Sequence, residues 1–99
     1  MSLINLQKSI KEMRVKRGFT MDPTRIYTLL VEEVGEVGGE LKRLWSKNND
    51  PFDKNDLEDE LADVFVMLAA LANQFDIDLE EAVLAKIGKD DKRDWASAK

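Results

Sequence analysis

Two segments of this 99-residue chain place apolar residues at helical spacing, and acidic residues interrupt both apolar faces. The first stripe consists of Ile26, Leu29, Leu30, Val37, Leu41 and Leu44, and the second of Leu57, Leu61, Val64, Leu68, Leu71 and Phe75. At about 100° per residue, Glu33 falls close to the centre of the first stripe and Glu36 on its margin. Glu60 falls within the second stripe, and Asp63 flanks it one turn further on. An unpartnered buried carboxylate is costly and neighbouring carboxylates repel one another, so we expect a positive group to join these four.

Apolar periodicity and capping signals predict four helices, whereas no segment alternates with the period of a strand. The predicted helices run from about 3 to 17, 23 to 47, 56 to 75, and from 79 onward. The signals at their ends are Gly18 after the first helix, Asp22 and Pro23 before the second, Asn55 or Asp56 before the third, and Asp78 with Glu81 before the fourth. We therefore expect an all-α, four-helix bundle that forms a single domain over residues 1–99.

The predicted third helix is apolar on most of its sides between Leu61 and Ala72, which exceeds the one stripe that a small monomer needs. In the second helix, Gly35, Gly38 and Gly39 each cost up to about 1 kcal/mol relative to alanine. Such glycines usually allow a neighbouring helix or a ligand to approach closely. The apolar excess of the third helix favours an oligomer, in which a subunit interface covers it.

Composition narrows the chemistry that this chain can perform. The net charge of −5 and the pI near 4.7 disfavour binding to nucleic acid, which requires a basic surface. The chain contains no cysteine and no histidine, so its chemistry depends on carboxylates, lysine, arginine and a metal ion. The longest apolar run, residues 64–72, is about half the length of a membrane span, and the N-terminal residues do not resemble an export signal. We expect a cytoplasmic protein without a membrane segment.

Acidic residues three apart on a helix point in one direction, so two such pairs on facing helices can enclose a cation. Oxygen ligands without histidine or cysteine select hard ions, and we expect Mg²⁺ before Mn²⁺ or Ca²⁺, with Mn²⁺ as a substitute. Because Mg²⁺ sites of this kind usually include substrate phosphates, the pattern indicates phosphate chemistry.

The run LLVEEVGEVGGELKRLW, followed by LEDELADVFVMLAALANQFDIDLEEAVLAK, resembles the MazG-like nucleoside triphosphate pyrophosphohydrolases. The signature of that family, EExxE followed by ExxD, is matched by Glu32, Glu33 and Glu36 and then by Glu60 and Asp63. The resemblance extends over roughly residues 3–95. It implies an all-α fold, assembly as a homodimer or homotetramer, a requirement for Mg²⁺, and cleavage of (d)NTP to (d)NMP and pyrophosphate.

Carried over to this sequence, the resemblance implies that the metal ligands are Glu33, Glu36, Glu60 and Asp63. Glu33 or Glu32 is then the base that accepts a proton from the attacking water. Lys86 and Arg93 match the tail that approaches the phosphates in the family, although Asp90 stands where relatives have asparagine and Gly88 is unusual there. Some relatives carry another acid where Gly39 lies, a role that Glu40 can fill.

Trp45 closes the helix that carries the metal glutamates and is our candidate for contact with the nucleobase, although tryptophans pack in cores and interfaces more often. The main alternative function is a non-catalytic helical interaction or regulatory module, which the apolar third helix favours. A di-iron carboxylate bundle also places acids on facing helices, but it normally requires Glu-x-x-His motifs, and this chain has no histidine.

Overall fold

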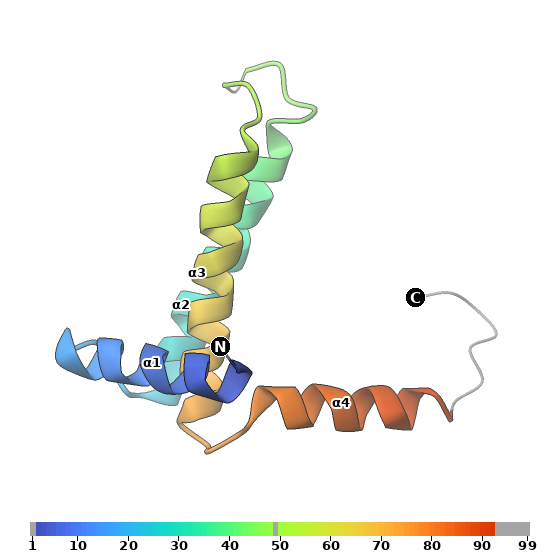
Figure 1. The fold of residues 1–99 in the computed structure, drawn as a ribbon. Coiled ribbons are helices and arrows are strands. Elements are labelled where there is room, and N and C mark those ends of the chain that lie inside the picture. The colour runs from blue at the N-terminus through green and yellow to red at the C-terminus, as the bar shows by residue number, and fades with distance from the viewer. Residues whose placement is uncertain (1, 49, 93–99) are drawn as a thin grey trace.

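The computed structural model describes residues 2–48 and 50–92. Within these residues the chain forms four helices and no strand, which confirms the predicted all-α class. The helices are α1 (Leu3–Lys16), α2 (Pro23–Lys42), α3 (Lys54–Asn73) and α4 (Leu79–Asp90). Figure 1 shows α2 and α3 as a long antiparallel hairpin, with α1 crossing one end of it.

Short polar side chains begin each helix. Ser2, Asp22, Asp53 and Asp78 accept hydrogen bonds from backbone N–H groups of the first turns of α1 to α4. The prediction that Asn55 or Asp56 caps the third helix is wrong, because Asp53 has the extended backbone of a cap and its carboxylate accepts from Asn55 N at 2.8 Å. Gly18 ends α1 with a φ of +69°, as predicted.

The second helix ends earlier than the apolar pattern predicts. After Lys42, the N–H groups of Arg43, Leu44 and Trp45 each donate to a carbonyl three residues back, at 3.0 to 3.2 Å. These bonds form a tighter 3₁₀ turn, in which each N–H donates to the carbonyl three residues back instead of four, and they satisfy carbonyls at the end of the helix. The prediction of a helix to about Lys47 is therefore wrong by roughly one turn.

The apolar core lies between α2 and α3 at the end of the hairpin that α1 crosses. Ile26 of α2 is fully buried against Met67 and Ala70 of α3, and Leu30 and Leu71 pack around them. Along the whole hairpin, other members of the two apolar stripes stay exposed in a single copy of the chain. They include Leu29, Leu41, Leu44, Leu61, Leu68 and Phe75.

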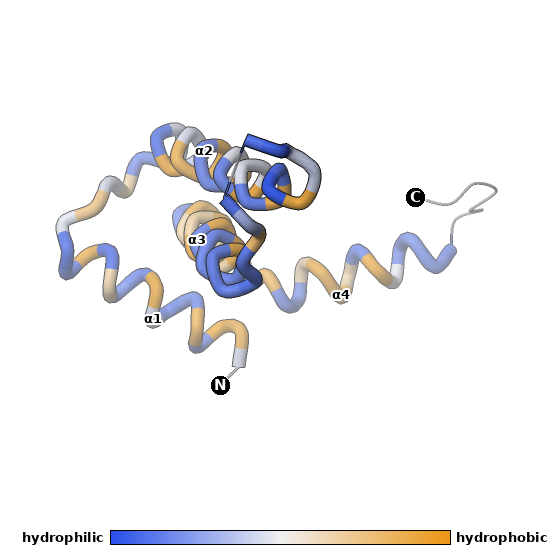
Figure 2. The backbone as a smooth tube through the Cα atoms, turned by 90° about the horizontal axis from the view of Figure 1, so that it is seen from above, coloured by the Kyte–Doolittle hydropathy of each residue, from blue (hydrophilic) through white to orange (hydrophobic). Residues whose placement is uncertain are grey.

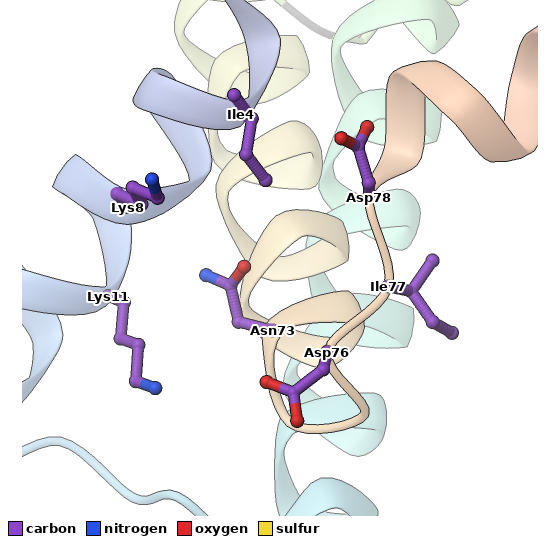
Figure 3. A pocket seen from close by; sticks show the side chains of 7 residues that line it. All are labelled: Ile4, Lys8, Lys11, Asn73, Asp76, Ile77 and Asp78. Atoms are coloured by element: carbon purple, nitrogen blue, oxygen red, sulfur yellow. The ribbon is translucent and has the colours of Figure 1, made fainter.

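Polar groups join α1 to the segment between α3 and α4. The Gln7 side chain, 1% exposed, donates to Asn73 Oδ1 at 3.1 Å and to the carbonyl of Ile77 at 2.9 Å. It accepts from the N–H of Leu79 at 2.9 Å, and Asn73 Nδ2 donates to the carbonyl of Gln7 at 2.9 Å. Figure 3 shows this junction, where Asn73 points towards α1 and residues 76–78 form the linker to α4. These bonds fix the direction in which α4 leaves the hairpin.

The fourth helix extends away from the hairpin rather than lying along it. Figures 1 and 2 both show α4 projecting to one side, and among the described helices its main contacts are with α1. The four helices thus do not close into a bundle within one copy of the chain. None of the described helices is long and apolar enough to cross a membrane.

Candidate metal centre

Three carboxylates from the two antiparallel helices meet in the space between α2 and α3. Glu33 and Glu36 of α2 and Glu60 of α3 each offer one oxygen, and these oxygens all lie within 4.8 Å of one another. The spacing of three residues on α2 directs its two acids to the same side of the helix, where α3 supplies the third. The structure therefore brings together three of the four metal ligands that the sequence suggested.

Two of these carboxylates are partly withdrawn from water without a partner. Glu33 Oε2 and Glu60 Oε2 are inaccessible to solvent, and no hydrogen-bond donor among the described residues reaches them. Buried polar atoms in folded proteins nearly always have partners, and an exception calls for an explanation such as an ion.

The cluster raises the pKa of two of its members. Burial is the main cause of the raised pKa of Glu33, with further contributions from the charges of Glu36 and Asp63. The pKa of Glu60 rises to about 7, chiefly because Glu36 can accept a hydrogen bond from the protonated Glu60, and secondly because of burial. Without a cation, the cluster thus tends to keep a proton near neutral pH.

The remaining acids of the sequence motif lie at the edge of the cluster. Asp63 is exposed on α3, and its charge raises the pKa of both Glu33 and Glu60. Glu32 is exposed on α2, and its charge has a smaller effect on Glu33. Both carboxylates therefore lie close enough to act on the cluster without being among the three that converge most closely.

An open hollow of about 430 Å³ borders the cluster on the side of the C-terminal turns of α2. Its lining consists of Glu36, Gly39, Glu40, Lys42, Arg43 and Glu60. Glu40 Oε2 is buried and makes no hydrogen bond among the described residues, although Arg43 Nη1 lies 3.5 Å from it. A side chain added at Gly39 would meet no atom within 4 Å, so this glycine leaves the hollow open.

Sequence reasoning missed Arg43 as a member of the site. The signal was available, because Arg43 lies seven residues, or about two helical turns, beyond Glu36 and so on the same side of the helix. A basic residue at the end of a helix is ordinarily interpreted as a cation that interacts with the helix dipole. For this reason Arg43 was not considered as a site residue.

The predicted substrate-binding residues are not gathered at the cluster in one copy of the chain. Lys86 lies on α4, where its Nζ is 2.8 Å from Asp90 Oδ1, and α4 extends away from the hairpin. Trp45 follows α2 and is 74% exposed, and it does not line the hollow. Arg93 lies outside the described residues.

The donor set fits a hard divalent cation. Every converging group is a carboxylate oxygen, the ligand type that Mg²⁺ and Mn²⁺ favour. Glu33 and Glu60 also each carry a solvent-inaccessible oxygen that has no hydrogen-bond partner among the described residues. Fold and site together define a class of all-α proteins with a carboxylate cluster between two antiparallel helices.

Comparison with known proteins identifies the family. The MazG nucleotide pyrophosphohydrolase domain matches residues 21–95, which include α2, α3 and α4, and the chain belongs to this family. The chain is also similar to the uncharacterized protein YpjD of Bacillus subtilis (strain 168), with 34% identity over 85 residues. That match covers 81% of this chain and 76% of the Bacillus protein.

Proposed function

We propose that this protein is a Mg²⁺-dependent nucleotide pyrophosphohydrolase that cleaves a (d)NTP to the (d)NMP and pyrophosphate. The observation that carries the proposal is the pair of solvent-excluded, unpartnered oxygens of Glu33 and Glu60 within a cluster of converging carboxylates. Membership of a family of nucleotide pyrophosphohydrolases supplies the class of substrate.

In this proposal Glu33, Glu36, Glu60 and Asp63 hold Mg²⁺, for which Mn²⁺ can substitute. The bound ion would neutralise phosphate oxygens and lower the pKa of a coordinated water. The four carboxylates hold it from two helices, so their spacing depends on the packing of α2 against α3. Asp63 would complete the ligand set from its exposed position beside the other three.

The reaction is the attack of water on the α-phosphorus. A bond forms between the water oxygen and this phosphorus, and the bond from the phosphorus to the β-bridging oxygen breaks, which releases pyrophosphate. Glu33 or Glu32 accepts the proton that the water loses. Glu32 suits this task because it is exposed beside the cluster, whereas the raised pKa of Glu33 brings its basicity closer to neutral pH.

We also propose that the working form is a homodimer or homotetramer in which Lys86, Arg93 and Trp45 contact the nucleotide held by another copy. Support comes from α4, which leaves its own hairpin (Figure 2) and carries exposed apolar side chains. The large apolar residues that are exposed on α3, on α4 and on the linker between them are Leu61, Leu68, Phe75, Ile77, Val83, Leu84 and Ile87. A second copy would bury this surface and bring cationic groups towards the carboxylates.

The test is to incubate the protein with individual (d)NTPs and Mg²⁺, with and without EDTA, and to separate the products by chromatography. The proposal predicts monophosphate and pyrophosphate in a 1:1 ratio, and no turnover when EDTA is present. Formation of diphosphate and orthophosphate, or no reaction with any nucleotide, would contradict it.

The exposed apolar surface of α3 and α4 also suits a second candidate, a non-catalytic helical interaction or regulatory module. That function would survive chelation of divalent ions, and it gives no reason for the unpartnered carboxylate oxygens. The product analysis with EDTA therefore separates the two candidates.

A further inference from the structure

The hollow beside the carboxylate cluster is lined by cationic as well as anionic residues. Lys42 and Arg43 line it together with Glu36, Glu40 and Glu60. We propose that Arg43 binds the β- and γ-phosphates of the nucleotide that the carboxylate centre holds, and so steadies the pyrophosphate as it leaves. This inference rests on the proposed function and adds a phosphate-binding residue to it.

The position of the Arg43 guanidinium is fixed from both helices. Its Nη1 lies 3.5 Å from Glu40 Oε2 on the same helix and 3.4 Å from Asp56 Oδ2 on α3. The Arg43 side chain is 27% exposed, whereas the Glu40 side chain is only 15% exposed. The guanidinium is thus held at the boundary between the hairpin and the open hollow.

These contacts leave most of the donors of the guanidinium unused. Both ion pairs involve Nη1 at long distances, and within the described part of the chain neither Nε nor Nη2 of Arg43 makes a hydrogen bond. A guanidinium presents five N–H groups in a planar fork that matches the oxygens of a phosphate. Arg43 can therefore keep its pair with Asp56 while it donates to a phosphate.

Arg43 also lies where the β- and γ-phosphates of a bound nucleotide would extend. The hollow that Arg43 lines also contains Glu36 and Glu60, so a triphosphate whose α-phosphate lies at the carboxylates would extend its other phosphates into it. Gly39 has no side chain to fill this space. In contrast to Lys86 on the projecting α4, Arg43 reaches the site from the same copy of the chain.

A purely structural role for Arg43 is the competing explanation, because the pair with Asp56 links α2 to α3. Asp56→Asn breaks this link and leaves the guanidinium in place. If Arg43 acts on the site only by joining the helices through Asp56, Asp56→Asn weakens nucleotide binding as much as Arg43→Gln does. If Arg43 binds phosphate, only Arg43→Gln weakens nucleotide binding.

The experiment is calorimetric titration of the full chain with an α,β-methylene deoxynucleoside triphosphate in the presence of Mg²⁺. Arg43→Gln should weaken binding about 10- to 100-fold, as expected for the loss of hydrogen bonds from a charged group. Arg43→Lys, which keeps the charge without the fork, should lose less. Asp56→Asn should bind within about 3-fold of the wild type.

Arg25→Gln provides a matched control. Arg25 also lies on α2 and pairs with an acid three residues back, Asp22 at 3.8 Å, but it stands at the opposite end of the helix. Arg25→Gln changes the net charge by the same amount as Arg43→Gln, and it should leave the affinity for the nucleotide analogue unchanged. If the wild type and Arg43→Gln bind the analogue with equal affinity, the phosphate-binding role of Arg43 is overturned and the proposed function is not. If the wild type does not bind the analogue at all, the proposed function itself is overturned.

Discussion

Two polar clusters in this molecule are withdrawn from solvent, and they differ in whether their hydrogen bonds are satisfied. At the junction of α1 with the linker before α4, Gln7 uses its amide nitrogen and oxygen, and each partner is within 3.1 Å. Between α2 and α3, Glu33 and Glu60 each have a buried oxygen that no donor among the described residues reaches. The hydrogen bonds of the first cluster are satisfied within the fold, whereas the second cluster has buried oxygens without a partner among the described residues.

This difference separates structural polar residues from candidate functional ones by a physical criterion. A satisfied cluster stabilises the folded chain, and removing one member leaves the others unpaired. A cluster of like charges instead destabilises the folded chain until a cation binds. Substitutions in the two clusters should therefore have opposite effects on stability and activity.

The largest expected effect is the loss of activity in Glu36→Gln. Because this substitution removes the charge of one proposed metal ligand, turnover should fall roughly 100- to 1,000-fold, the range for loss of a group that stabilises charge in a transition state. Helix content by circular dichroism should not change. Glu58→Gln, at an exposed position on α3, is the control and should keep wild-type turnover. Full activity of Glu36→Gln would remove this residue from the metal centre.

Next in size is the loss of stability in Gln7→Ala. The substitution leaves the N–H of Leu79 and the carbonyl of Ile77 without their partner, and unsatisfied buried groups cost about 1–3 kcal/mol each. The free energy of unfolding, measured by urea denaturation, should fall by about 2–4 kcal/mol. Ser9→Ala, at an exposed position of the same helix, should change it by less than about 0.5 kcal/mol. An unchanged stability of Gln7→Ala would show that the junction does not hold the fold together.

A smaller effect on the stability of the folded chain is expected when the pH is varied in the absence of divalent ions. The pKa of Glu60 is about 7 in the folded chain, above the ordinary value of 4.5. Because a raised carboxyl pKa stabilises the protonated folded form, this contribution is present in full below about pH 4.5 and is lost as the pH rises through 7.

The melting temperature in EDTA should accordingly fall between pH 5 and 7.5, and Mg²⁺ should reverse this fall. Glu60→Gln should flatten the profile in EDTA. A wild-type melting temperature that rises over this interval in EDTA would argue against repulsion within the cluster.

The smallest effect concerns the linker at the satisfied junction. Asp76 has a φ of +52°, in the left-handed region that residues other than glycine, asparagine and aspartate seldom adopt and that only glycine adopts without strain. Asp76→Gly should raise the free energy of unfolding by up to about 1 kcal/mol, whereas Asp76→Ala should lower it by a similar amount. Thermal denaturation of both variants checks the sign. A loss of stability in Asp76→Gly would indicate that the aspartate side chain itself holds the linker.

Sequence alone predicted the all-α class and, from helical periodicity, that Glu33 and Glu36 point to the same side of one helix. That acids of the third helix meet them was an expectation from the family resemblance, and the structure brings Glu60 to them while Asp63 lies at the edge.

The sequence did not predict the direction of α4, since this depends on hydrogen bonds from Gln7 to residues about 70 positions away. Periodicity on one helix carries no information about such contacts. Arg43 differs from α4 in this respect, because its spacing from Glu36 already places it on the same side of the helix, and only its pair with Asp56 on α3 was beyond the reach of periodicity.

The burial of Arg14 was also beyond sequence reasoning. Its side chain, 5% exposed, donates to the carbonyl of Thr20 at 3.1 Å and stacks over Phe19 at 5.3 Å from the ring centre. A charged residue on a helix is usually solvated, but the loop after α1 and Met67 of α3, whose sulfur lies 3.6 Å from Arg14 Nη1, cover this one.

Titration calorimetry of the wild-type protein with Mg²⁺ at pH 7, in two buffers of different ionisation enthalpy, tests the central claim most directly. We predict saturable binding with net release of protons, because Glu60 is partly protonated at this pH and must ionise to bind a metal ion. Glu60→Gln should bind more weakly and release fewer protons. Absence of saturable binding of Mg²⁺ or Mn²⁺ to the wild type would contradict the claim that these carboxylates form a metal centre.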